Sequence, residues 1–279
     1  LPILTGAAVG SGALSSVSAS GVWVSSKNQT ASTRRLYSFS AFGDSNAATS
    51  YAGQGSFADS AAALTHYNAG PYNLSSAPNT NFGQLADVLV ADNGNVYFSS
   101  QQSGCVYKLD PSTGWADASW CAASTVTYTG GNEPSRVYGM TKAPNGDIYA
   151  VNYARAYSGG PVDAKVIRIV PSNSAVGPTR SADTVTTTKV TGVNNVVGIA
   201  TDGSTIWLAS DGSGSNPNKI LEIDSPQFGT DVADPTASSY DTITPPGAAA
   251  YSLQKMVYDA PRDRLILANN DSKLLVYLR

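Results

Sequence analysis

Charged residues are scarce in this sequence of 279 residues, and the shortage excludes several classes of function. They make up 13% of the chain, and 17 Lys and Arg against 20 Asp and Glu give a formal net charge of -3 at pH 7. Binding to nucleic acid or to an anionic membrane surface needs a basic face. A membrane-spanning helix needs about 20 consecutive apolar residues, and no run in this sequence is nearly that long. We therefore expect neither nucleic acid nor a membrane as a partner.

The sequence has very little histidine, and it lacks the nucleophile motif of common hydrolases. His66 is the only histidine, which excludes a zinc site built on two or more histidines. A Ser-His-Asp arrangement would have to use this one residue, and the sequence contains no Gly-X-Ser-X-Gly elbow. We expect His66 to be a surface or packing residue.

Cysteine is limited to Cys105 and Cys121. An antiparallel hairpin centred on residue 113 would place the two opposite each other, close enough for a disulfide. We predict a structural disulfide between them; the alternative is a pair of free buried thiols in a reducing compartment.

The surface composition favours an extracellular protein. Lysines are few, small hydroxylated residues are many, and three Asn-X-Ser/Thr triplets begin at Asn28, Asn73 and Asn270. No secretory leader is visible in the first eight residues, as expected for a mature chain whose leader has been removed. We predict secretion, with glycosylation at these three asparagines.

The strongest positive signal is an internal repeat. A pattern of aromatic and β-branched residues followed by small polar ones occurs at residues 22–26, 96–100, 148–152, 206–210 and 265–269. It is typical of a buried strand that ends in a loop. Turns with Asn-Gly or Asp-Gly precede three copies, at residues 92–94, 144–146 and 201–203, and supply the positive φ that tight hairpins need. Fourth strands are predicted at residues 125–128, 184–187 and 241–244.

Four antiparallel strands per unit at this spacing are the signature of a β-propeller. The second strands begin at residues 22, 96, 148, 206 and 265, so the gaps are 74, 52, 58 and 59 residues. We therefore predict an all-β, single-domain propeller over residues 1–279, with five four-stranded blades and an insertion at about 44–63. A sixth, degenerate blade in the first gap is the main alternative, and a β-sandwich is the other.

The two chain ends suggest how such a ring would close. The last unit supplies three strands before the chain stops at Arg279, and residues 2–6 resemble the fourth strands of other units. We predict that this N-terminal strand completes the C-terminal blade, beside the strand around Leu275, and so removes an exposed edge.

This order of strand, Asn-Gly turn and strand resembles the propeller group that includes the gluconolactonase/senescence-marker (SMP-30) family, NHL-repeat proteins and strictosidine-synthase-like proteins. The resemblance covers most of the chain, although most members have six blades. The gluconolactonase family holds a divalent metal at the starts of its innermost strands, where this chain has Ala86, Tyr138, Val197 and Gln254. Three of these lack a suitable oxygen, and Asp87 is the only carboxylate nearby. We predict no catalytic metal and no cofactor.

Propellers usually bind ligands where loops enter the innermost strands and where second strands pass to third strands. Those loops are rich here in amides and tyrosines, which suit a neutral, partly apolar small molecule or a sugar. We predict catalytic roles for Tyr138 and Arg136. The predicted ligand-binding residues are Gln84, Asp87, Asn152, Tyr153, Asn194, Asn195, Asp211, Tyr251, Gln254 and Asn269.

The leading functional hypothesis is a secreted, monomeric, metal-independent enzyme. It would hold a small organic molecule in a reactive shape, for a cyclisation, a cycloaddition or a related reaction of secondary metabolism. The alternatives are a lectin-like propeller, and an interaction scaffold that uses residues 44–63 as partner surface or lid. Aromatic residues that share one repeat position are predicted to be core because they lie mid-strand; these are Trp23, Tyr97, Tyr149 and Trp207.

Overall fold

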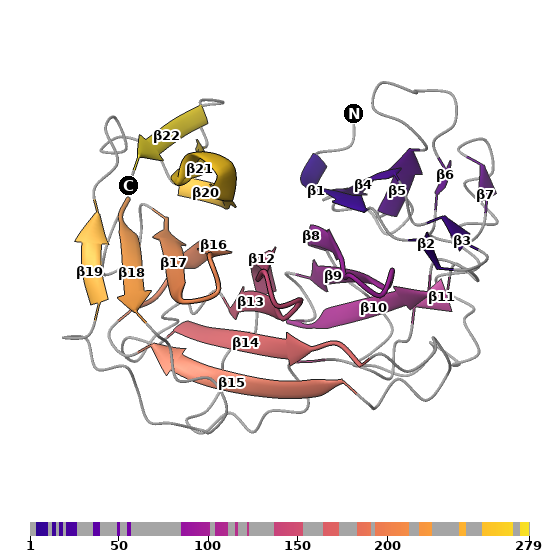
Figure 1. The fold of residues 1–279 in the computed structure, drawn as a ribbon, viewed down its shortest axis with the longest axis horizontal. Coiled ribbons are helices and arrows are strands. Elements are labelled where there is room, and N and C mark those ends of the chain that lie inside the picture. The colour runs from indigo at the N-terminus through magenta and orange to yellow at the C-terminus, as the bar shows by residue number, and fades with distance from the viewer. Residues whose placement is uncertain are drawn as a thin grey trace. The chain divides into compact units, whose positions relative to one another are not determined.

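The computed structural model describes the backbone of residues 4–10, 13–14, 17–18, 21–26, 36–39, 49–50, 55–56, 85–100, 104–110, 115–116, 122, 137–152, 164–172, 183–190, 193–211, 218–224, 240–243, 253–269 and 274–278. Almost all of these residues lie in antiparallel strands or in the turns between them (Figure 1). The chain divides into two compact units, and each is described by itself. Unit 1 comprises Leu1–Thr125 and Pro171–Thr184, and unit 2 comprises Val126–Val170 and Val185–Arg279.

The described residues of unit 1 form two larger sheets and a short hairpin. The first sheet has the order β1-β4-β5-β6-β7, and the second has the order β11-β10-β9-β8. Their strands are β1 (Leu4–Gly10), β4 (Gly21–Ser26), β5 (Leu36–Phe39), β6 (Thr49–Ser50), β7 (Gly55–Ser56), β8 (Leu85–Val90), β9 (Val96–Ser100), β10 (Val106–Asp110) and β11 (Trp115–Ala116). The hairpin pairs β2 (Ala13–Leu14) with β3 (Val17–Ser18).

In unit 2 the described strands form three sheets, each with its strands in sequence order. The orders are β12-β13-β14-β15, β16-β17-β18-β19 and β20-β21-β22. The strands are β12 (Val137–Lys142), β13 (Ile148–Asn152), β14 (Ala164–Val170), β15 (Thr184–Val190), β16 (Val196–Thr201), β17 (Thr205–Ser210), β18 (Ile220–Asp224), β19 (Tyr240–Ile243), β20 (Leu253–Asp259), β21 (Arg264–Asn269) and β22 (Leu274–Leu278). The predicted fourth strands at 184–187 and 241–244 therefore correspond to β15 and β19.

The N-terminal strand is not paired as the sequence predicted. β1 pairs antiparallel with β4, with Ala7 opposite Val24 and Val9 opposite Val22. It is therefore the first strand of the first sheet, and closure of the last sheet by this segment is not confirmed. Pairing with β4 closes a short loop, which costs less chain entropy than pairing with a strand at the far end of the sequence.

Two further segments differ in detail from prediction. The predicted insertion at 44–63 includes β6 and β7, which extend the first sheet. Beside β10 lies β11, with Leu109 opposite Ala116, whereas a hairpin centred on residue 113 would pair Leu109 with residue 117. Residues 125–128, the expected fourth strand of this sheet, lie outside the described residues.

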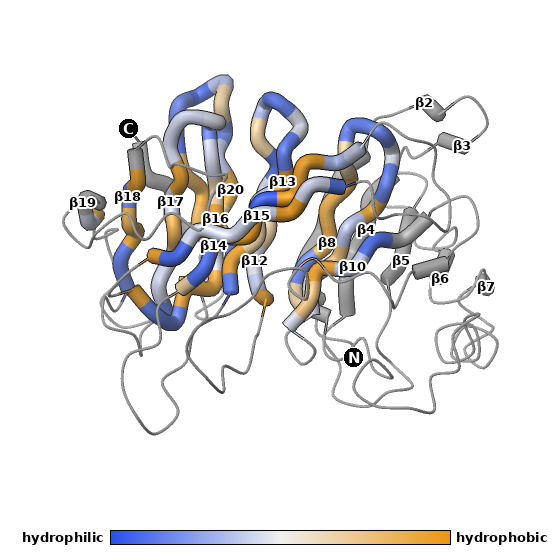
Figure 2. The backbone as a smooth tube through the Cα atoms, turned by 90° about the horizontal axis from the view of Figure 1, so that it is seen from below, coloured by the Kyte–Doolittle hydropathy of each residue, from blue (hydrophilic) through white to orange (hydrophobic). Residues whose placement is uncertain are grey.

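The repeated strand pattern is buried on both faces, which explains its unbroken apolar character. Every residue of β9, β13 and β17 is buried. The repeated aromatic position belongs to the core in the three copies whose side chains are described: Tyr97, Tyr149 and Trp207 are at most 5% exposed. The side chain of Trp23, the fourth copy, lies outside the described part of the structure. Desolvation raises the pKa of Tyr149, an effect that nearby Arg168 opposes. Figure 2 shows apolar residues along the strands and hydrophilic residues at the hairpin turns.

The predicted glycine turns are present. Gly94, Gly146 and Gly203 all have positive φ, at 83°, 89° and 98°. In the first two turns the side chain of Asn93 or Asn145 accepts a hydrogen bond from the backbone N–H two residues later. The glycine turns therefore adopt the backbone conformation that the sequence predicts for tight hairpins.

The last sheet replaces the glycine turn by a short 3-10 helix, Ala260–Arg262, followed by Asp263 in the left-handed region. The turn is held by Asp259, whose Oδ2 accepts hydrogen bonds from Arg264 Nε at 2.7 Å and Arg262 Nη1 at 3.2 Å. The hydrogen bond from Arg264 is the main cause that holds the pKa of Asp259 below its ordinary value.

Replacing Asp259 by Asn should therefore lower the thermal midpoint at neutral pH and have no effect in strong acid. Because the carboxyl has a lower pKa folded than unfolded, it stabilises the fold above its unfolded pKa and loses this effect as the pH falls through the folded value. Melting curves of both proteins at pH 7 and at about pH 2 would measure this. A difference in midpoint that persists in acid would contradict it.

Candidate functional site

The sheets of unit 2 share one edge at which first strands begin and second strands end. Val137 lies opposite Asn152, Val196 opposite Ser210, and Leu253 opposite Asn269. In each pair of strands the register shifts next to this point, so the start of the first strand is bulged. Bulges redirect side chains at sheet ends and are frequent beside functional sites. We call this edge of unit 2 the asparagine edge, after the residues described next.

Asn152 is the most unusual side chain of the asparagine edge. It is 1% exposed, and its Nδ2 has no hydrogen-bond partner among the described residues. Lys165 at the start of β14 lies directly opposite it and is 7% exposed, and opposite residues of antiparallel strands project from the same face. This face is the one away from Tyr149 and Val151, since alternate residues of a strand point to opposite sides. The pair brings an amide donor and an ammonium group to one face.

The segment that enters β16 runs beside the start of β14. The N–H of Ala164 donates to the carbonyl of Val193 at 2.6 Å, which brings Asn194 and Asn195 close to the strand that carries Lys165. Asn195 has a positive φ of 53° and its carbonyl accepts from the N–H of Asp211 at 2.9 Å. The backbone of the entry segment is thereby fixed to the loop that follows β17.

Asn218 was missed by the sequence analysis. It lies ahead of β18 at the same edge, because Ser210 donates its N–H to the carbonyl of Lys219. It too has a positive φ, 56°, and its buried Oδ1 has no hydrogen-bond partner in the part of the chain that the structure describes. A left-handed asparagine close to a strand start could have been noticed in the sequence, whereas the lack of a partner could not. Lys165 was also missed, because it reads as an ordinary residue of an outer strand.

The predicted site residues separate into three groups. Tyr138, half-buried on β12, joins Asn152, Asn194, Asn195 and Asp211 on the asparagine edge, and Gln254 and Asn269 belong by their backbone to the last sheet of unit 2. Asp87 is in unit 1, buried on β8, where its Oδ1 accepts from the N–H of Val88. Outside the described residues are His66, Gln84, Arg136, Tyr153, Tyr251, Cys121, Asn28, Asn73 and Asn270.

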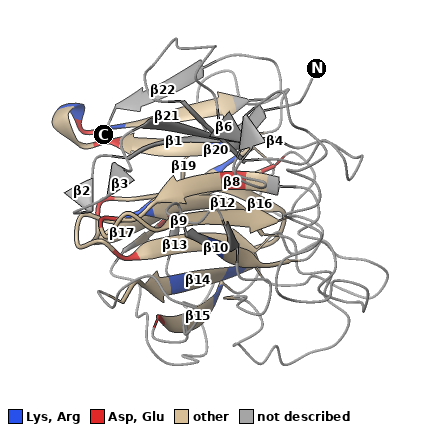
Figure 3. Ribbon diagram, turned by 90° about the vertical axis from the view of Figure 1, so that its right-hand side faces the viewer, with Lys and Arg blue, Asp and Glu red and all other residues tan. Residues whose placement is uncertain are grey.

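Two other predictions concern cysteine and metal. Cys105 is disulfide-bonded, and the chain has one other cysteine, Cys121, which is not among the described residues. Within the described part of the chain, no three His, Cys, Asp or Glu side chains group as they would to hold a metal ion. In that part there is also no helix long and apolar enough to span a membrane. Figure 3 shows how sparse charged residues are along the strands.

Comparison with known proteins identifies the fold. No family model matches the sequence, and none of the curated proteins matches it. Among solved structures, the β-propeller domain of Cps50 (Swd1) from Myceliophteria thermophila superposes with a TM-score of 0.50 at 8% identity, over 93% of this chain and 66% of that one. The fold is of the β-propeller type.

Two further solved structures are similar at low identity. One is the extracellular domain of a protein described as a hybrid two-component system from B. thetaiotaomicron, with 12% identity and a TM-score of 0.51 over 98% of this chain but 27% of the other. Another is a gluconolactonase from Xanthomonas campestris, with 11% identity and a TM-score of 0.46 over 100% and 86% of the two chains. At these low identities the likeness concerns the fold alone.

Proposed function

We propose that this protein is a secreted, metal-independent propeller enzyme that binds a neutral, carbonyl-containing small molecule at the asparagine edge. The observation that carries the proposal is the unpartnered Nδ2 of Asn152, in a side chain that is 1% exposed. Leaving a buried amide donor without a partner costs about 1–3 kcal/mol. Retaining one is expected where a ligand supplies the missing acceptor.

The arrangement suits polarisation of a carbonyl group. Asn152 Nδ2 and the ammonium group of Lys165 are donors on one face, and donors held in place around a developing oxyanion stabilise the transition state. Tyr138 would contribute a phenol for proton transfer.

Replacing Asn152 by Leu tests the proposed site, because we expect the thermal midpoint to be kept or raised while ligand binding and turnover fall. The variant removes an unsatisfied amide, so its thermal midpoint should equal or exceed that of the natural protein, while binding and turnover should fall at least about tenfold, the equivalent of one hydrogen bond of 1.4 kcal/mol. The ligand for this test is found by screening neutral lactones, esters and amides, first by thermal shift and then by turnover.

Thr187 offers a matched control. Its Oγ1 is also buried without a partner, but it lies on the outer strand β15. Thr187→Val should preserve both stability and ligand binding. If Asn152→Leu bound and turned over every active compound like the natural protein, the proposed site would be wrong.

A further inference from the structure

A buried polar cluster of unit 1 has features that the proposed function does not use. Lys108 on β10 and Asp183, just ahead of β15, form an ion pair whose side chains are 4% and 0% exposed. Lys108 Nζ lies 3.0 Å from Oδ1 and 2.9 Å from Oδ2. The amine nitrogen is therefore within hydrogen-bond distance of both carboxyl oxygens, which are joined by the electrophilic carbon Cγ.

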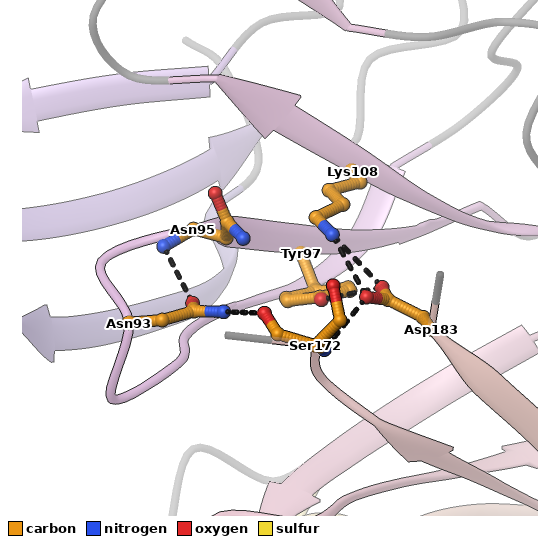
Figure 4. A network of polar contacts seen from close by, with 6 residues as sticks. All are labelled: Asn93, Asn95, Tyr97, Lys108, Ser172 and Asp183. Atoms are coloured by element: carbon orange, nitrogen blue, oxygen red, sulfur yellow. Dashed lines mark hydrogen bonds and ion pairs between the residues drawn. The ribbon is translucent and has the colours of Figure 1, made fainter. Parts of the chain in front are cut away.

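Each oxygen of Asp183 also receives a second donor of a different kind. The hydroxyl of Tyr97 donates to Oδ2 at 2.7 Å, and the backbone N–H of Ser172 donates to Oδ1 at 2.9 Å. Asn93 Nδ2 in turn donates to the carbonyl of Ser172 at 2.9 Å, which fixes that backbone in place. Figure 4 shows the carboxylate at the centre of these groups.

We propose that Lys108 and Asp183 form an intramolecular isopeptide bond. The donors match the two roles that amide formation needs. Ser172 N–H would stabilise the negative charge that develops on Oδ1 when the amine attacks, as an oxyanion-hole donor does. The Tyr97 hydroxyl contacts Oδ2, the oxygen that must leave, and can relay a proton to it.

The reaction balances without an added reagent. A proton passes from the Lys108 ammonium to Oδ2, which removes two charges whose burial costs several kcal/mol each. The Nζ lone pair then forms a bond to Cγ, and the C=O electrons move to Oδ1. As the carbonyl re-forms, the Cγ–Oδ2 bond breaks and Oδ2 takes a second proton from Nζ. The products are a secondary amide and one water molecule.

Burial favours the amide over its hydrolysis. Groups held in reactive geometry have effective concentrations of up to about 10⁵–10⁸ M, and the released water leaves a site in which the side chains of Lys108 and Asp183 are 4% and 0% exposed. The bond would join β10 to the residue that precedes β15. It would resist heat and reducing agent, unlike a disulfide.

Intact-mass measurement of the full chain tests the proposal, with the protein produced in a host that adds no N-glycans and then denatured and fully reduced. The expected mass is that of the sequence less one water molecule, and proteolysis should yield one branched peptide that joins the segments around Lys108 and Asp183. Lys108→Arg keeps the positive charge but not the nucleophilic amine, and should have the full sequence mass. Tyr97→Phe should form the bond more slowly, with a larger unreacted fraction soon after purification.

Two results would overturn the proposal. One is natural protein that retains the full sequence mass after prolonged incubation in its folded state. The other is loss of water that maps to any site other than Lys108 and Asp183. Both are measured on the natural chain, so they do not depend on whether a variant folds.

Discussion

Replacing Lys108 by Met should lower the free energy of unfolding by about 3–5 kcal/mol relative to natural protein in which Lys108 and Asp183 are still an unreacted ion pair, because this is the usual cost of removing one partner of a buried pair. Met fills much of the same volume, so the loss reports on the charge and its bonds rather than on a cavity. Asp183 would remain buried with Tyr97 and Ser172 as donors but without a cation. Denaturant titration, with the midpoint and slope compared, measures the change.

Arg262→Met is the matched control for Lys108→Met. Arg262 also pairs with an aspartate, Asp259, but its side chain is 64% exposed, and exposed ion pairs contribute little. We expect no measurable shift for this variant. If both variants lowered the free energy of unfolding equally, the explanation that the cost arises from burial of the ion pair would be wrong. A double variant, Lys108→Met with Asp183→Leu, should be more stable than the sum of the single losses predicts.

Replacing Gly139 by Ala should also destabilise the protein, by about 3 kcal/mol, at the upper end of the range for overpacking. A Cβ at residue 139 would lie 2.7 Å from the carbonyl oxygen of Val197 and 3.2 Å from Cα of Gly198. These atoms belong to the backbone of β16, which cannot move aside like the end of a side chain. The whole strand would have to shift away from β12.

The control for Gly139→Ala is the next residue along the strand. Met140 is 3% exposed, and Met140→Leu conserves volume, so its cost should stay below about 1.5 kcal/mol. Because Gly139 is next to Tyr138, Gly139→Ala should also disturb the asparagine edge. A Gly139→Ala protein with the natural unfolding midpoint would show that β12 and β16 do not approach as closely as described.

The elements that could be predicted from sequence are those set by neighbouring residues. Asn-Gly and Asp-Gly pairs predicted the positive-φ turns at Gly94, Gly146 and Gly203, because few other residues adopt that geometry without strain. The repeated apolar pattern predicted the buried strands β9, β13 and β17, and it placed Tyr97 and Trp207 in the core.

Pairing between distant segments could not be predicted in the same way. The segment that forms β1 resembles a fourth strand in composition, and nothing local distinguishes one edge from another, so its partner was wrongly predicted. Lys108 and Asp183 are 75 residues apart in the sequence, and each alone reads as a surface charge. Their burial follows from where the chain ahead of β15 packs.

In the candidate site, too, some residues could be predicted from sequence and others could not. Sequence reasoning selected Asn152, Asn194, Asn195 and Asp211 because they follow or precede strands, and the register of unit 2 does bring them to one edge. It could not select Lys165, which faces Asn152 only because β14 pairs with β13 at that register.

The linear order of residues determined by itself the strands, their turns and the propeller-type fold, since hydrophobic periodicity and backbone conformational preference act over a few residues. Tertiary structure decided which polar groups are enclosed and which of them lack a partner. Exclusion from water is a property of the packed sheets, and it alone turns an ordinary asparagine into an unsatisfied donor, or an ordinary lysine and aspartate into a reactive pair.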